Sequence, residues 1–137
     1  TKWPVANDDN NAQVIRIAEM YLIRAEARIL GTTVDIPGAQ SDIDAIRDRA
    51  GLGGTTAATV PDLMDEIMDQ RKKEFFAEGH RWFDLIRTGR ALTTLSGLTR
   101  SEGSSTYSLG DADRQVFPFP NKDVQTNKNL EQNEAYK

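Results

Sequence analysis

The stretch that decides the fold is QRKKEFFAEGHRWFDLIR, residues 70–87. It combines charges and large aromatic side chains in one amphipathic run that holds a single glycine. Charges this dense among aromatics favour a buried or half-buried ion network, because a buried charge must be paired. Arg71 falls on the helical side of Ile67 and Phe75, so its guanidinium is expected to bind a carboxylate of Glu74, Glu78 or Asp84. The predicted structural ion network consists of Arg71, Glu74, Glu78, Arg81, Asp84 and Arg87.

Glu74 and Glu78 also allow a catalytic interpretation. One helical turn would separate their β-carbons by about 5–6 Å, which resembles the carboxyl spacing of a retaining glycosidase. Neighbouring arginines favour ionised carboxylates, however, whereas a general acid must keep its proton. The ion network is therefore the favoured interpretation, and Arg71→Ala or Glu78→Ala is expected to destabilise the fold.

The first half of the chain shows helical periodicity. Apolar residues recur at spacings of three and four over residues 12–30, and they cover enough of the helix to require neighbours on two sides. Gly31 fits a left-handed cap, and residues 31–40 are expected to form a loop. A short helix is predicted over 39–50, with Gly51 as its cap.

The second half contains one strong helix and much irregular sequence. Residues 53–56 are expected to form a flexible linker, and Thr59 is the predicted N-cap of a helix that Gly79 interrupts. Helix then continues over 81–87. Residues 93–115 are predicted to form a long loop, and 116–120 must be extended because of their prolines.

These patterns together predict an all-α fold of antiparallel helix pairs of tetratricopeptide-like type, with long irregular loops and an extended carboxy-terminal tail. A single domain is expected over residues 1–137, because this length suits one domain better than two.

Composition excludes several classes of function. The net charge is −4 and the isoelectric point is about 5.0, with no separate basic block, so nucleic acid is not an expected partner. Cysteine is absent and His80 is the only histidine, which excludes thiolate chemistry and His-rich metal sites; no cofactor is expected. Since Thr1 is not an initiator methionine, the chain is expected to be an excised or processed piece.

The remaining candidate sites carry weaker signals. Trp82 and Phe83 could form a platform for a sugar ring, although core packing is the favoured interpretation. Because they point about 100° apart on a helix, one is expected to enter the core and the other to lie near the surface. Trp3 and Tyr107 lie in polar, irregular sequence and are the weak candidates for ligand binding. The acidic residues at 7–11 and 111–113 do not complete the spacing of a calcium loop, so no metal site is predicted.

Four segments in this order resemble the carboxy-terminal part of the SusD/RagB family. They are AEMYLIRAEA at 18–27, IRDRAGL at 46–52, the stretch at 70–87, and FPFP at 117–120 followed by residues 127–136. The chain departs from the family pattern at Gln70, where a glutamate is usual before the arginine.

The resemblance implies an outer-membrane lipoprotein on the external face of Bacteroidetes-type cells, with its lipid anchor outside this chain. Such proteins work with a SusC-like TonB-dependent transporter and bind oligosaccharides or other nutrients without catalysis. The resemblance also implies that the chain is the carboxy-terminal fragment of a longer protein. A helical-repeat adaptor that binds only protein is the alternative, and a glycoside hydrolase is the least favoured.

Overall fold

A computed structural model describes residues 15–96, 98, 99, 106, 107 and 115–137. The chain divides into two compact units, one ending at Glu78 and the other beginning at Gly79. Each unit is described by itself below, and the single domain over 1–137 stays a prediction. The described residues are mainly helical, as predicted.

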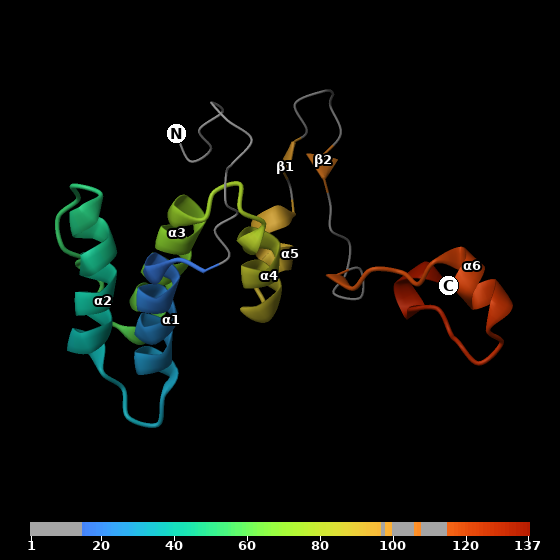
Figure 1. The fold of residues 1–137 in the computed structure, drawn as a ribbon, viewed down its shortest axis with the longest axis horizontal. Coiled ribbons are helices and arrows are strands. Elements are labelled where there is room, and N and C mark those ends of the chain that lie inside the picture. The colour runs from blue at the N-terminus through green and yellow to red at the C-terminus, as the bar shows by residue number, and fades with distance from the viewer. Residues whose placement is uncertain (1–14, 97, 100–105, 108–114) are drawn as a thin grey trace. The chain divides into compact units, whose positions relative to one another are not determined.

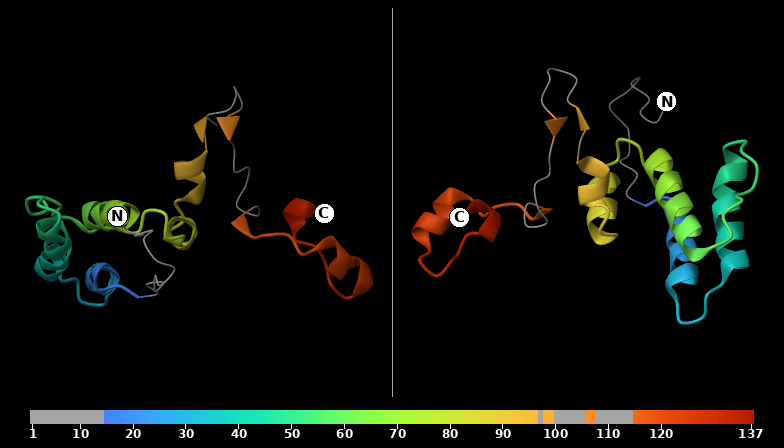
Figure 2. Two further views of the ribbon diagram at one scale, coloured as in Figure 1. Left: turned by 45° about the horizontal axis from the view of Figure 1, so that its top comes forward. Right: turned by 180° about the vertical axis from the view of Figure 1, so that it is seen from behind.

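Three helices form the first unit: α1 (Ile17–Leu30), α2 (Ile36–Arg49) and α3 (Val60–Glu74) (Figure 1). Each helix contacts the other two, and Figure 2 shows them from two further sides. Polar contacts fix the helix directions: Arg28 near the end of α1 donates to the carbonyl of Gly38 near the start of α2, and Glu19 near the start of α1 lies beside Arg71 near the end of α3. Helix α1 is therefore antiparallel to both α2 and α3.

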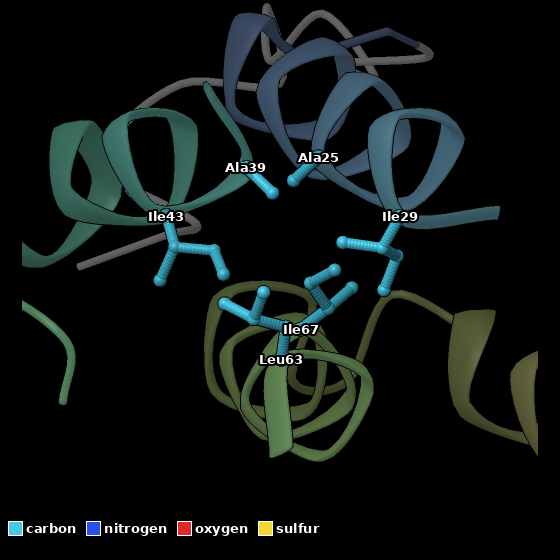
Figure 3. Packing of buried hydrophobic residues seen from close by; sticks show 6 residues of the cluster. All are labelled: Ala25, Ile29, Ala39, Ile43, Leu63 and Ile67. Atoms are coloured by element: carbon cyan, nitrogen blue, oxygen red, sulfur yellow. The ribbon is translucent and has the colours of Figure 1, made fainter. Parts of the chain in front are cut away.

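The core of the first unit lies where these helices meet. Two side chains from each helix converge on one point and exclude water (Figure 3). They are Ala25, Ile29, Ala39, Ile43, Leu63 and Ile67. A second cluster joins Ala18, Leu22, Ile46 and Phe75. Burial of these apolar side chains is the main force that holds the three helices together.

The connection between α2 and α3 is not the flexible linker that its glycines predicted. Arg47 Nε donates to the carbonyl of Gly53 over 2.7 Å, and Asp44 Oδ1 accepts from the amide of Thr55 over 2.6 Å. Gln40 Nε2 then donates to the carbonyl of Ala57 over 2.6 Å. These three α2 residues lie at helical spacing on one face, so the connection returns along α2 and α3 starts level with the beginning of α2.

Two helix boundaries also differ from prediction. Helix α1 begins at Ile17, and Arg16 before it is extended (φ −124°, ψ 143°), which lets its side chain reach the end of α3. Helix α2 begins at Ile36, inside the predicted loop, because Pro37 fits the first turn and Asp35 Oδ1 caps the amide of Gly38 over 2.9 Å.

The predicted caps have mixed outcomes. Gly31 has φ −69° and is not left-handed, so that prediction was wrong. Gly51 has φ +72°, and the amide of Leu52 donates to the carbonyl of Arg47, which confirms the cap there. Thr59 Oγ1 accepts from the amide of Asp62 over 3.3 Å and is the N-cap of α3.

The second unit begins after a break in the helix. Helix α3 already ends at Glu74, before the interruption predicted at Gly79. Gly79 itself takes φ +83° and precedes α4 (His80–Arg87), so a second helix begins after it as predicted. Helix α5 (Ala91–Leu95) lies partly inside the stretch predicted as a loop. Strands β1 (Leu98–Thr99) and β2 (Thr106–Tyr107) pair antiparallel, with Leu98 opposite Tyr107. These two-residue strands are too short to change the assignment of the fold to the all-α class.

The carboxy-terminal tail contains two short helical segments. Helix α6 (Asn121–Thr126) follows Pro120, and a 3₁₀ helix, η2 (Glu134–Tyr136), lies near the end of the tail. Residues 116–120 are not helical, in agreement with their two prolines.

Candidate functional site

Charged side chains gather where the ends of the three helices of the first unit meet. This charge cluster consists of Arg16 before α1, Arg49 at the end of α2, Glu74 at the end of α3, and Glu78. Arg16 and Arg49 each bind one carboxylate oxygen of Glu74, and Arg16 Nη1 lies 3.2 Å from Glu78 Oε1. Both glutamate side chains are largely buried. Since both oxygens of Glu74 accept from guanidiniums, this carboxylate is engaged in joining helices.

Arg71 contributes to the same end of the bundle. It is buried, and its Nη2 lies 3.7 Å from Glu19 Oε1 on α1. The guanidiniums of Arg16 and Arg71 lie 5.3 and 5.1 Å from the centre of the Phe75 ring, within the range of a cation–π interaction. Glu19 is a partner that sequence reasoning missed, because partners were sought only among residues 70–87. Its place in the first turn of α1, next to the buried Ala18, was the available signal.

Asp42 forms a second charged site, between α1 and α2. Its carboxylate is only 2% exposed and accepts from Arg24 Nε over 2.9 Å and from Arg28 Nη1 over 2.8 Å. The hydrogen bond that Arg24 donates to the Asp42 carboxylate raises the pKa of Arg24 above its ordinary value. Sequence reasoning missed this site too. The available signal was an acid on the apolar side of a helix, between Ala39 and Ile46.

Gln70, where the sequence departs from the family pattern, is buried and makes a hydrogen bond. Its Nε2 donates to Glu66 Oε1 over 2.9 Å, and Arg47 Nη1 lies 2.5 Å from the same oxygen. Glu66 thus joins a neutral amide and a guanidinium. Although a glutamate is usual at position 70 in the family, the glutamine here still takes part in hydrogen bonding at the interface between α2 and α3.

The other predicted network residues lie on α4, in the second unit. Asp84 is buried, and its Oδ1 accepts from Arg87 Nε over 2.9 Å. Arg81 is half-buried on the same helix. The structure thus gives direct contacts for most of the six residues, while their shared role in stability remains a prediction.

The two aromatic residues of α4 differ in burial, as expected. Phe83 is 70% exposed and lies at the surface, whereas Trp82 is half-buried. The buried apolar residue of this helix is Leu85. Because residues two positions apart point about 200° apart on a helix, burial of Leu85 turns Phe83 toward solvent.

Several weaker candidates fall partly or wholly outside the described residues. Trp3 and the acidic residues at 7–11 and 111–113 lie outside them, and Tyr107 lies on β2. Within the described ranges, no group of three or more His, Cys, Asp or Glu side chains could hold a metal ion. The helices seen in those same ranges are all too short or too polar to cross a bilayer.

An open acidic hollow runs along α3, beside the end of the returning connection. Asp62 in it accepts from the hydroxyl of Thr59, and Asp69 binds Lys73. Its lining residues are Thr56, Ala57, Asp62, Asp65, Glu66 and Asp69. Since none of these is aromatic, the hollow offers no surface on which a sugar ring could stack.

Comparison with known proteins agrees with this helical scaffold. The sequence model of the SusD family matches residues 1–136. SusD-like protein P38 of Formosa agariphila is 32% identical, and starch-binding protein SusD of Bacteroides thetaiotaomicron is 35% identical, each over 94% of this chain. This chain spans 25% and 22% of the length of those two curated relatives.

A solved structure gives the same result for the fold. Surface glycan-binding protein A of Bacteroides thetaiotaomicron superposes with a TM-score of 0.72 and 31% identity. The match covers 92% of this chain and 25% of that one. By its sequence match over nearly its whole length, this chain belongs to the SusD family.

Proposed function

We propose that this chain is the carboxy-terminal part of a longer glycan-binding protein that acts at the bacterial cell surface without catalysis. The observation that carries the proposal is the family match over residues 1–136, together with 35% identity to a starch-binding protein. The similarity to a surface glycan-binding protein supports the same ligand class.

The charged side chains support a binding scaffold rather than a hydrolase. Glu74 and Glu78, the one candidate pair of carboxylates, both lie against Arg16, and Arg49 binds Glu74 as well. A glycosidase needs one carboxyl that delivers a proton and another that faces the sugar. In the proposed function, these carboxylates instead join helix ends, and loop aromatics bind sugar. Trp3 and Tyr107 remain the candidates for that contact.

The proposed partner is a SusC-like TonB-dependent transporter in the outer membrane. The longer protein would be held on the external face by a lipid anchor outside this chain, and would bind oligosaccharide before import. Family membership supports this arrangement. In it, residues 15–78 serve as a rigid support for the surfaces that meet ligand and transporter.

The test uses the longest natural polypeptide that carries this sequence. Starch-derived and other oligosaccharides are titrated into it by calorimetry, and the same mixtures are assayed for new reducing ends. Saturable binding without new reducing ends is the expected result. Binding followed by hydrolysis that Glu74→Gln abolishes would contradict the proposal. Absence of affinity for any glycan, with capture of a protein partner, would favour the adaptor.

A further inference from the structure

The outward face of α1 is apolar, which sets it apart from its two neighbours. Six residues of this helix are exposed, and only Arg24 among them is charged. Ile17 is 71% exposed, and Met20, Ile23 and Leu30 are also exposed. We call the five apolar residues the α1 stripe: Ile17, Met20, Ile23, Ala27 and Leu30.

The stripe lies opposite the buried face of the same helix. At 100° per residue, its members fall within a sector centred about 170° from the buried residues. Figure 3 shows Ala25 and Ile29, two of those buried residues, pointing toward α2 and α3. The stripe therefore points away from both partners, and α1 is apolar on two opposite sides.

The outward faces of α2 and α3 have an ordinary composition. The exposed residues of α3 are Pro61, Asp62, Asp65, Lys72 and Lys73, and those of α2 include Ser41, Asp48 and Arg49. A helix with one apolar face suits the surface of a domain, whereas a helix that is apolar on two sides suits an interior position. Even Arg24, the single charge on the outward face of α1, turns its guanidinium to Asp42 and the Tyr21 ring.

We propose that the α1 stripe is the docking face for another helix of the same, longer polypeptide, so that α1 is an interior helix in the whole protein. This inference rests on the proposed function in one respect, that the chain is part of a longer protein. The relatives are about four times as long as this chain, which spans 22–25% of them. They therefore contain enough additional chain to cover the stripe.

The shape of the stripe indicates a helix as its occupant. Its members follow spacings of 3, 3, 4 and 3 and extend over about 20 Å. Such a straight row of side chains packs into the grooves of a second helix at a small crossing angle. Ala27, between Ile23 and Leu30, leaves room for a large side chain from the partner. The expected partner is an amphipathic helix with its apolar face toward α1.

Because the chain contains no cysteine, a single introduced thiol can report on the cover of the stripe. Ile23→Cys and Met20→Cys place the thiol on the stripe, and Lys72→Cys places it on the exposed, polar face of α3 as the matched control. Each variant is made in the 137-residue chain and in the longest natural polypeptide that carries it. The rate of labelling by a thiol reagent is read by mass spectrometry at that site, in dilute protein whose helix content matches the unsubstituted form.

In the longer polypeptide, the stripe thiols are expected to react at least about tenfold more slowly than the Lys72→Cys thiol. In the 137-residue chain, all three should react at similar rates. Equal reactivity in the longer polypeptide would overturn the proposal. Protection of the stripe thiols that is already present in the 137-residue chain would also overturn the proposal, because a segment of this chain would then cover the stripe. If that protection falls on dilution, the cover is a second copy of the chain. Glycan titration is a separate readout, so loss of sugar binding with a protected stripe would reject only the proposed ligand.

Discussion

The three-helix unit and the carboxy-terminal tail are held in different ways. In the first unit, buried side chains from α1, α2 and α3 form continuous clusters. Among residues 115–137, none is buried, and Phe117 is 79% exposed. The first unit is stabilised by burial and by ion pairs at its edges, whereas the tail depends on hydrogen bonds from side chains to its own backbone.

The proline pattern explains how the tail is held. Pro118 and Pro120 have no amide hydrogen and keep the segment extended, which leaves the backbone groups of residues 117 and 119 available. The side chain of Gln132 accepts from the amide of Phe119 and donates to its carbonyl, each over 2.9 Å. Asn133 Nδ2 donates to the carbonyl of Phe117 over 2.7 Å. Two amide side chains thus take the place of a neighbouring strand.

The largest expected effect comes from the core of the first unit. Ile67→Ala removes a fully buried side chain at the point where the helices meet, and should lower the free energy of unfolding by about 4 kcal/mol. Urea denaturation followed by circular dichroism measures it. Ile67→Val is the control and should cost about 1 kcal/mol. Similar small losses for both variants would show that the cluster is not a tightly packed core.

Removal of a buried charge should have the next largest effect. Arg71→Ala removes the guanidinium beside Glu19 and the cation over the Phe75 ring, and should cost about 2–3 kcal/mol. The same urea titration measures it. Arg71→Lys keeps the charge but loses the planar fork, so it should recover only part of the stability. Full recovery would mean that charge alone matters at this position.

The N-cap of α3 should contribute less. Thr59→Ala removes the side-chain oxygen that accepts from the amide of Asp62, and should cost about 1 kcal/mol. Thermal unfolding should show a lower melting temperature, and Thr59→Ser should restore it. A melting temperature unchanged in Thr59→Ala would contradict the role of the cap.

The smallest effect is expected in the tail. Gln132→Ala removes both hydrogen bonds to Phe119, which together should contribute about 1 kcal/mol or less to local order because the site is exposed. Amide exchange at Phe119 should accelerate, with the exchange of α1–α3 unchanged. Gln132→Glu keeps an acceptor but loses the donor, so it should have an intermediate effect. Accelerated exchange throughout the first unit would show that the two regions are not independently held.

The sequence predicted those features of the fold that depend on the chemistry of a few neighbouring residues. The N-cap at Thr59, the cap at Gly51 and the start of a new helix after Gly79 each follow from a residue's own backbone preference or capping group, and the structure confirms all three. The helical patterns likewise predicted the all-α class, and the four family-like segments predicted the family.

Long-range partners could not be predicted in the same way. Glu19 lies beside Arg71 although 52 positions separate them in sequence, and Arg16 binds Glu74 across a similar separation. The path of residues 53–57 depends on three polar side chains of α2, so their glycines alone suggested a flexible linker. Such pairings depend on how the helices pack together. The apolar periodicity within one helix carries no information about that packing.

The central claim is that the carboxylates of the charge cluster join helices and do no chemistry. The most direct measurement is the free energy of unfolding of Glu74→Gln against the unsubstituted chain, with Lys72→Gln on the exposed face of α3 as the control. The account predicts a loss of about 1–3 kcal/mol for Glu74→Gln, because Arg16 and Arg49 each lose the ion pair with this carboxylate, and almost none for the control. Unchanged stability in Glu74→Gln would contradict the claim.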